Sequence, residues 1–267
     1  MKKISILPAL FLVFTACNDS GETKTDKKTM YSDLVAENLK GDISAIEESP
    51  YKTDSTGKIG DMDSCCISVS EYDENGNNVK WISKDSKGIV KETGTVSRYE
   101  NGKWKGQTTM KDGKTTSSFE TTVDENGKYN GGHTYDSTGK LEFYYTGISE
   151  NEQSQVLSWK QWDKDSVFRM EGIATYDKFL QTGFTLKDSV GKVKSSSTSK
   201  YNDNGELTER SNTNVTKDSS TTTVTKFTYD THDETGNWTQ RTEWDDKGKA
   251  TKIVKRTYTY KKKEEKK

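Results

Sequence analysis

Apolar and polar side chains alternate along most of the chain, as they do in strands that bury one face. Phe184 and Leu186, for example, share one face of such a strand, and Thr185 between them belongs to the other. Helical spacing is confined to a short stretch from Tyr31 to Leu39, which Gly41 closes. The pattern therefore predicts an all-β domain that follows one short helix.

An acidic turn signal separates the predicted strands fourteen times, at intervals of about 13 residues. The residue that leads the signal alternates between two kinds, so one strand–turn–strand–turn unit is repeated about every 26 residues. The first kind is Tyr72-Asp73, Tyr99-Glu100, Val123-Asp124, Ile148-Ser149, Tyr176-Asp177, Tyr201-Asn202 and Tyr229-Asp230, and the second is Lys84-Asp85, Lys111-Asp112, Tyr135-Asp136, Trp162-Asp163, Lys187-Asp188, Lys217-Asp218 and Trp244-Asp245. Since each turn reverses the chain, we expect the two kinds at opposite edges of a sheet. The tyrosines of the first kind would form a ladder along one edge, either packing each ring on the next hairpin or stacking on a ligand.

The turns themselves carry recognisable chemistry. In Asp73-Glu74-Asn75-Gly76 and similar segments, an Asp caps the opening of the turn and a Gly takes the position of positive φ. Asn101-Gly102 and Asp112-Gly113 predict two-residue hairpin loops. Only one proline, Pro50, lies outside the N-terminal apolar segment, so nothing interrupts the strands that follow it.

These features predict a long antiparallel meander of about seven 26-residue hairpin repeats. Open twisted sheets of more than about ten strands tend to curl or split, so we expect a curled or partly closed single sheet. An outer-membrane barrel is not expected, because Thr, Lys and Glu occupy many positions where lipid-facing strands need apolar residues.

The N-terminus has the pattern of an export signal. Lys2 and Lys3 precede an apolar run that is too short to span a bilayer, and Phe14-Thr15-Ala16-Cys17 resembles the lipobox of bacterial lipoproteins. The resemblance implies cleavage before Cys17, a lipid on its sulfur, and an outer-membrane lipoprotein that faces the periplasm or the cell surface. The expected organisation is a signal peptide at 1–16, a lipidated cysteine and flexible tether at 17–30, a short helix or cap at 31–41, the hairpin-repeat domain at 42–260 and a charged tail at 261–267.

Charge and composition narrow the possible functions. The net charge of −1 argues against nucleic acid, which requires a basic face. Neither an enzyme nor a cofactor is expected, because no Gly-rich phosphate loop, G-x-S-x-G elbow or C-x-x-C pair is present. Cys65 and Cys66 are adjacent, and we expect unpaired thiols more than a disulfide between them.

A metal centre and a catalytic site are not expected either. Only two histidines occur, and His232 falls in what reads as a turn insertion from Asp230 to Gly236. Asp233, Glu234, Asp245 and Asp246 would hold calcium only if their turns met, and the spacing of an EF-hand is missing.

Two segments resemble the Y-D-x-x-G-N core of YD (Rhs-type) repeats: Tyr72-Asp73-Glu74-Asn75-Gly76-Asn77, and Tyr229-Asp230 through Gly236-Asn237. The segment from Leu39 to Glu48 is similar to the opening of small YD-repeat lipoproteins of Bacteroidetes bacteria. The resemblance implies hairpin repeats on an envelope protein. Encapsulation of a toxin, which large members perform, is not implied, since no toxin domain follows.

The sequence predicts a membrane-anchored, non-enzymatic lipoprotein of the envelope that presents an extended surface to other proteins. The alternative is a module that binds glycans or cell wall, for which exposed rings of Trp104, Tyr144, Trp159 and Trp238 would stack on sugars. The exposure of these four rings separates the two hypotheses. The expected partners are the membrane, through Cys17, and unidentified envelope proteins or glycans.

Overall fold

The computed structural model describes residues 32–54, 56–63, 66–98, 104–110, 112–126 and 128–262. These residues form one short helix and seventeen strands, all of them in a single antiparallel sheet. The elements are α1 (Asp33–Ala36), β1 (Ile43–Thr53), β2 (Ile59–Met62), β3 (Ile67–Tyr72), β4 (Asn78–Lys84), β5 (Val90–Arg98), β6 (Trp104–Met110), β7 (Thr115–Val123), β8 (Tyr129–Asp136), β9 (Leu141–Glu150), β10 (Val156–Asp163), β11 (Phe168–Asp177), β12 (Leu180–Asp188), β13 (Val193–Tyr201), β14 (Leu207–Val215), β15 (Ser220–His232), β16 (Trp238–Trp244) and β17 (Ala250–Tyr260).

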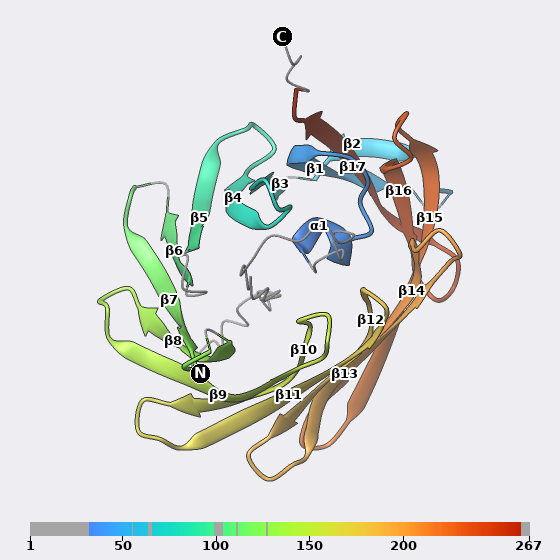
Figure 1. The fold of residues 1–267 in the computed structure, drawn as a ribbon. Helices are drawn as coiled ribbons and strands as arrows, with labels where there is room; N and C mark the ends of the chain where they lie inside the picture. The colour runs from blue at the N-terminus through green and yellow to red at the C-terminus, as the bar shows by residue number, and fades with distance from the viewer. Residues whose placement is uncertain are drawn as a thin grey trace.

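The sheet closes into a barrel, which Figure 1 shows as a ring of strands. Each strand from β4 to β16 pairs with the strands before and after it, and β1 pairs with both β3 and β17. Ala45 thus lies opposite Glu71 on one side and Thr259 on the other. Sixteen strands make the wall, and β2, which pairs with β1, is a short appendage to it.

The expectation of a curled, partly closed sheet is therefore wrong. The first and last strands of the meander pair at eight positions, from Ile43↔Tyr260 to Tyr51↔Ile253. Closure satisfies the backbone N–H and C=O groups that two free edges would expose to other chains.

The predicted turn chemistry is confirmed in eleven turns. In each, Oδ1 of an Asp or Asn accepts hydrogen bonds from the N–H groups two and four residues later, as Asp188 does from Val190 and Lys192 at 3.1 and 2.9 Å. In the ten of these turns whose residue three positions after the Asp or Asn is described, that residue has positive φ, and it is Gly except at Ser154 and Ser166. These turns open at Asp54, Asp73, Asp85, Asp124, Asp136, Asn151, Asp163, Asp188, Asn202, Asp233 and Asp245.

Three turns differ from the prediction. The last turn of the first kind opens at Asp233, so Tyr229-Asp230 lies within β15. Likewise β9 runs through Ile148-Ser149 to Glu150, and Asn151 opens its turn. Around Asp112-Gly113, the Met110 N–H donates to the Lys114 carbonyl at 2.9 Å, which gives a longer loop than a two-residue hairpin.

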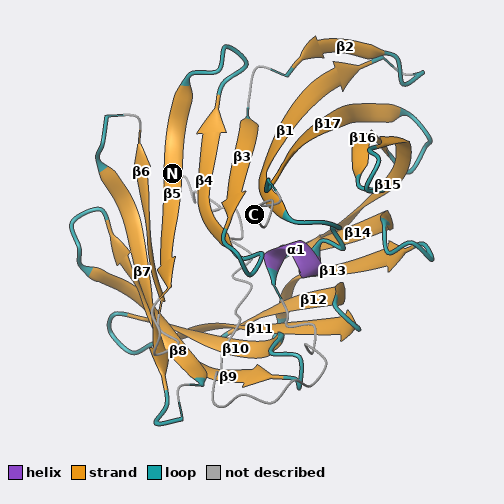
Figure 2. Cartoon of the chain, turned by 45° about the horizontal axis from the view of Figure 1, so that its top comes forward, coloured by secondary structure: helices purple, strands orange, loops and turns teal. Residues whose placement is uncertain are grey.

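The two kinds of turn lie at opposite ends of the barrel, as expected from strands that alternate in direction. We call the end that carries the 73–77, 124–128, 202–206 and 233–237 turns the tyrosine end. Residues 32–42, which include α1, lie across this end, and we call them the strap (Figure 2). The strap packs Leu34 into a cluster with Ile43, Ile46 and Tyr72 of the wall.

Cys66 is disulfide-bonded, so the expectation of an unpaired thiol is wrong for this residue. Cys17 and Cys65 lie outside the described residues. No helix in the described part of the chain has the length and apolar character needed to cross a membrane.

Candidate functional site

A contact between the strap and β17 shows which side chains point into the barrel. Oε2 of Glu37, at the end of α1, lies 2.7 Å from Nη2 of Arg256. Since the strap lies across the mouth of the ring (Figure 1), Arg256 points inward. Residues directly opposite each other on paired strands share a face, and alternate residues along a strand change face. The registers of the paired strands therefore assign an inner and an outer wall around the whole barrel.

The interior is lined by side chains but not filled by them. Sixteen strands form a wider barrel than eight, whose side chains just fill the interior. In agreement, the inward residues Asn214 and Thr223 are exposed to solvent, and the inward rings of Phe184 and Phe227 are only partly buried. This lumen is the candidate site.

The inner wall of nine strands, β4 to β12, is rich in aromatic and apolar side chains. Three of its rings lie flat across a glycine of a neighbouring strand. A Cβ on Gly94 would lie 1.9 Å from Nε1 of Trp81, and one on Gly172 would lie 2.3 Å from Cε2 of Trp159. A Cβ on Gly106 would likewise lie 2.1 Å from Cε1 of Phe119. The glycines are needed because any side chain there would displace the ring that forms this wall.

The inner wall of β13, β14 and β15 is polar. Two rows cross these strands in register, Ser197↔Asn212↔Thr223 and Ser195↔Asn214↔Thr221. A third row, Ser199↔Arg210↔Thr225, brings a guanidinium to this wall. The polar wall is bordered by Phe184 and Leu186 on β12 and by Phe227 on β15.

A paired charge cluster joins β1, β16 and β17 beneath the strap. Nε of Arg256 lies 2.5 Å from Oε1 of Glu48, in addition to its contact with Glu37. Burial opposes ionisation of Glu48, but the charge and hydrogen bond of Arg256 outweigh it and lower the pKa of this carboxyl. The Trp238 ring lies between two guanidiniums, with Cζ of Arg256 4.1 Å and Cζ of Arg241 4.8 Å from its centroid.

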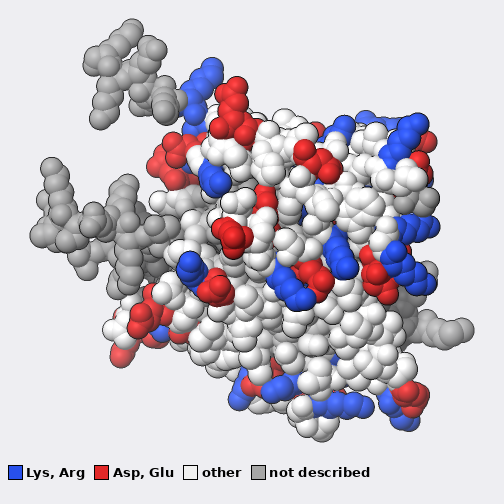
Figure 3. All heavy atoms as spheres, turned by 90° about the vertical axis from the view of Figure 1, so that its right-hand side faces the viewer, with Lys and Arg blue, Asp and Glu red and all other residues white. Residues whose placement is uncertain are grey.

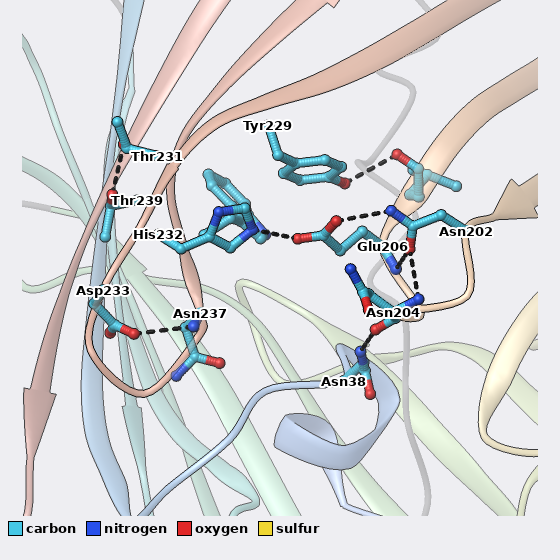
Figure 4. A network of polar contacts seen from close by, with 12 residues as sticks. Asn38, Asn202, Asn204, Glu206, Tyr229, Thr231, His232, Asp233, Asn237 and Thr239 are labelled. Atoms are coloured by element: carbon cyan, nitrogen blue, oxygen red, sulfur yellow. Dashed lines mark hydrogen bonds and ion pairs between the residues drawn. The ribbon is translucent and has the colours of Figure 1, made fainter.

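The strap is held at the tyrosine end by backbone and amide hydrogen bonds to three turns. The Lys40 N–H donates to Oδ1 of Asn237 at 2.8 Å, and Nδ2 of Asn237 donates back to the Lys40 carbonyl at 2.8 Å. At the 202–206 turn, Nδ2 of Asn38 donates to the Asn204 carbonyl at 2.5 Å (Figure 4). At the 73–77 turn, the Leu34 N–H donates to the Gly76 carbonyl at 3.1 Å.

Three tyrosines of the predicted ladder, Tyr176, Tyr201 and Tyr229, make contacts that run in the other direction from the one predicted. Their hydroxyls, and that of Tyr258 on β17, each donate to a carbonyl at the start of the preceding strand. The distances are 3.2 Å for Tyr176 to Val156, 2.8 Å for Tyr201 to Gln181, 2.9 Å for Tyr229 to Leu207 and 2.8 Å for Tyr258 to Trp238. These hydrogen bonds therefore link successive hairpins. Burial of the Tyr258 hydroxyl raises the pKa of this residue to about 12.

The four rings proposed for glycan stacking do not form one row. Trp104 and Trp238 are 4% and 7% exposed, and Trp159 is partly buried on the inner wall. Tyr144 alone points outward, where its ring lies nearly parallel to Trp162, with centroids 6.3 Å apart. The glycan hypothesis thus loses three of its four rings as an outer platform.

The structure places the two groups of residues that were considered for a metal or catalytic site, His232 and the Asp233 and Asp245 turns. His232 ends strand β15 and does not sit in a loop, and its Nε2 lies 2.5 Å from Oε1 of Glu206 (Figure 4). The Asp233 and Asp245 turns lie at opposite ends of β16, so their carboxylates do not meet. Among the described residues, no group of three or more His, Cys, Asp or Glu side chains is placed to hold a metal ion.

The outer wall is charged with both signs intermingled (Figure 3). Cross-strand ion pairs recur on it, with Lys80 2.9 Å from Glu71, Lys105 3.0 Å from Glu120 and Lys200 2.7 Å from Glu209. Each pair stands directly opposite in register, so these charges point away from the lumen.

No family model and no curated protein matches the chain. Its fold is similar to that of a porin-like protein from Bacteroides uniformis ATCC 8492, with a TM-score of 0.53 and 15% identity over 81% of this chain and 96% of that one. A porin-like protein from Bacteroides vulgatus ATCC 8482 (TM-score 0.36, 14% identity, 81% and 98% covered) and TcdB2-TccC3-TEV (0.30, 12%, 78% and 14%) also match, but scores this low do not establish a shared fold.

The protein is thus a closed antiparallel β-barrel with a lined lumen. At 15% identity the likeness concerns the fold alone. The resemblance to YD repeats continues to rest on the residues that carry it.

Proposed function

We propose that this protein is a lipid-anchored, non-enzymatic barrel of the bacterial envelope that holds an amphiphilic ligand in its lumen. The observation that carries the proposal is the distribution of side chains between the two walls. Aromatic rings line the inner wall and keep solvent-exposed surface, whereas Lys–Glu pairs cover the outer wall. A lipid-facing barrel has the opposite arrangement, and charged residues at the bilayer midplane cost about 2–4 kcal/mol for each Lys or Arg.

The anchor and the location are supported by the sequence. The apolar run and Thr15-Ala16-Cys17 favour export and lipidation, and the lipid would hold the barrel close to a membrane while its wall stays in water. An amphiphile is the ligand class that suits this interior, because its apolar part gains burial against Trp81, Phe119 and Phe184. Its polar part then faces the polar wall of β13 to β15.

The test compares ligand binding by variants of two adjacent residues on β12. The mature chain, with Cys17→Ser to prevent lipidation, is titrated with N-phenylnaphthylamine and with oleate, and tryptophan and probe fluorescence are recorded. Phe184→Asp changes the inner wall and should weaken binding by about tenfold or more, since a buried Phe contributes about 1.5–3 kcal/mol. Thr185→Asp changes the outer wall and should leave binding within about twofold.

Absence of saturable binding, or equal weakening by both variants, would overturn the proposal. The protein-interaction surface predicted from the sequence would then be the better hypothesis. In that case the ion-paired outer wall is the part to test, by cross-linking in envelope membranes.

A second candidate, glycan binding on the outer wall, rests on one observation. Tyr144 and Trp162 lie nearly parallel on neighbouring strands, and the His133 ring lies 6.4 Å from Tyr144. Within the described residues, Nδ1 of His133 is buried without a hydrogen-bond partner. Binding of a neutral polysaccharide that Tyr144→Ala abolishes and Phe184→Asp leaves intact would establish this site; a polysaccharide panel without such binding would remove it.

A further inference from the structure

The arginine on the polar inner wall differs from the other arginines of the barrel. Arg256 pairs with Glu37 and Glu48, Arg241 pairs with Glu243 at 3.0 Å, and Arg169 pairs with Asp163. Among the arginine side chains that the structure describes, only that of Arg210 has neither an ion pair nor a hydrogen bond.

The position of Arg210 on β14 follows from the register. Its neighbour Glu209 points outward and pairs with Lys200 on β13, so Arg210 points into the lumen between Ser199 and Thr225. The partly buried guanidinium thus projects from a wall, with five N–H donors and no protein acceptor among the described groups.

The side chains around Arg210 offer further donors and acceptors. Ser195, Ser197, Asn212, Asn214 and Thr223 point inward from three adjacent strands. The structure shows no hydrogen bond from any of these described side chains to another protein group, and Asn214 and Thr223 are exposed to solvent. Next to them, Phe184 and Leu186 begin the apolar wall.

Glu92 and Glu150 are inward carboxylates without an ion pair among the described residues, but neither neutralises Arg210. Glu92 lies on β5, opposite Met110 of β6 and seven strand-to-strand steps from β14 by the shorter way around the ring of sixteen. Glu150 lies on β9, opposite Val156 of β10 and five steps from β14. The polar wall therefore carries an uncompensated positive charge beside an apolar surface.

We infer that the lumen takes an anionic amphiphile, whose acidic head group, carboxylate or phosphate, binds Arg210 while its chain lies against the apolar wall. The inference rests on the proposed function and names its ligand class. A planar guanidinium matches the two oxygens of a carboxylate or phosphate in bidentate geometry. The free hydroxyl and amide groups next to Arg210 are placed to bind the remaining oxygens of the head group.

The experiment compares two ligands that share a chain and differ in the head group. Oleate and oleyl alcohol compete with N-phenylnaphthylamine for the mature chain carrying Cys17→Ser, and acetate supplies the head group without the chain. Oleate should bind at least about tenfold more tightly than oleyl alcohol, which is the effect of one hydrogen-bonded charge. Acetate should not displace the probe, because it has no apolar part.

Variants then assign the difference to one residue. Arg210→Gln should weaken the binding of oleate by about tenfold and leave the binding of oleyl alcohol unchanged. Arg210→Lys should retain part of the affinity for oleate that Arg210→Gln loses. Lys200→Gln removes a charge from the outer face of the neighbouring strand and is the matched control, which should change neither ligand. Circular dichroism and thermal melting establish that each variant is folded.

The outcomes separate the two proposals. If neither oleyl compound binds, the proposed function fails together with this inference. Equal affinity of the unchanged chain for both compounds, or equal weakening of both by Arg210→Gln, overturns the acidic ligand and leaves the lumen site standing. The comparison in the unchanged chain needs no variant, so a variant that fails to fold does not prevent a decision.

Discussion

Two serines occupy turn positions that the repeat elsewhere gives to glycine. Ser154 and Ser166 have φ of 63° and 60°, a conformation that strains an L-residue by roughly 1–2 kcal/mol. Glycine relieves the strain but loses more conformational freedom on folding, by roughly 0.5–1 kcal/mol. We expect Ser166→Gly to raise the free energy of unfolding by roughly 0.5 kcal/mol, measured by urea denaturation.

The matched control is Gly191→Ser, at the same position of the 188–192 turn. A Cβ at Gly191 would meet nothing within 4 Å, so the change tests backbone conformation alone. It should lower the free energy of unfolding by roughly 0.5 kcal/mol or more. Effects of the same sign in both variants would show that φ does not determine stability at this position.

The carboxylates that open the turns give stability a defined dependence on pH. Oδ1 of Asp136 accepts from the Thr138 hydroxyl at 2.7 Å and from the Lys140 N–H at 3.0 Å, and these bonds lower the pKa of Asp136, the hydroxyl most of all. A lowered pKa in the folded state means that the contribution is complete above the unfolded pKa of about 3.9. It is lost as the pH falls through the folded value.

Asn151 and Asn202 hold the same place in their turns with a neutral amide. We therefore expect Asp136→Asn to have nearly the same melting temperature as the unchanged protein at pH 7. Below pH 4 its melting temperature should fall less than that of the unchanged protein. Asp136→Ala, which removes the acceptor, should be less stable at both pH values. Parallel melting curves of the unchanged protein and Asp136→Asn from pH 7 to pH 3 would contradict this account of acid sensitivity.

At the scale of elements, the strap depends on one buried amide. Asn237 is 3% exposed and makes two hydrogen bonds with Lys40 and one, at 2.9 Å, with Tyr260. Each such bond contributes about 0.5–1.5 kcal/mol. Asn237→Ala should therefore accelerate hydrogen exchange of the Lys40 amide by about tenfold or more, while amides of β10 to β12 keep their rates.

Lys249→Ala is the control for Asn237→Ala. Lys249 is likewise the fifth residue of an Asp-led turn, but it lies at the end of the barrel away from the strap. The Lys249→Ala variant should leave the hydrogen-exchange rate of the Lys40 amide unchanged. Exchange that rises throughout the barrel in Asn237→Ala would show that Asn237 stabilises the fold as a whole and not the strap.

The ion pairs of Arg256 hold three elements together: the strap, β1 and β17. Arg256→Met leaves Glu48 among inward side chains without its partner, which should cost about 3 kcal/mol in urea denaturation. Glu48→Gln in the same chain removes the unpaired charge and should recover part of this loss. A loss below about 1 kcal/mol in Arg256→Met would show that solvent in the lumen screens Glu48.

Strands and turns were predictable because their causes are local. Alternation around Phe184, and the Asp-to-Gly spacing of turns such as 188–192, depend only on neighbouring residues. The turn near His232 was misplaced because Tyr229-Asp230 matches the repeat, whereas Asp233 and Gly236 supply the cap and the positive φ. The inward position of Arg210 was not predictable, since alternation shows which residues share a face but not which face is enclosed.

Closure of the barrel is a property of the whole molecule, and no single segment of the sequence predicts it. It depends on the register between β1 and β17, which are about 210 residues apart, and on twist that accumulates over every strand between them. Local signals are the same for a curled sheet and for a closed one. The residues that flank the paired strands also meet at this seam, where the Lys261 N–H donates to the Asp42 carbonyl at 2.7 Å.

The seam gives a prediction about cooperativity. Deleting residues 250–262 removes β17 and leaves β1 and β16 as unpaired edges, because β17 pairs with both. Exposed edges of this length promote pairing between chains. We expect the truncated protein to form oligomers in size-exclusion chromatography with light scattering, and to lose its sharp thermal transition in circular dichroism.

The matched control deletes a strand that is not part of the ring. Replacing residues 56–63 by a Gly-Ser link removes β2, which pairs only with the end of β1, at Tyr51 and Thr53. This protein should stay monomeric and melt cooperatively, because all sixteen strands of the wall keep both neighbours. A monomeric, sharply melting chain after loss of β17 would mean that fifteen strands can close by another register. The shape of the lumen would then be set by the repeat and not by the meeting of its first and last strands.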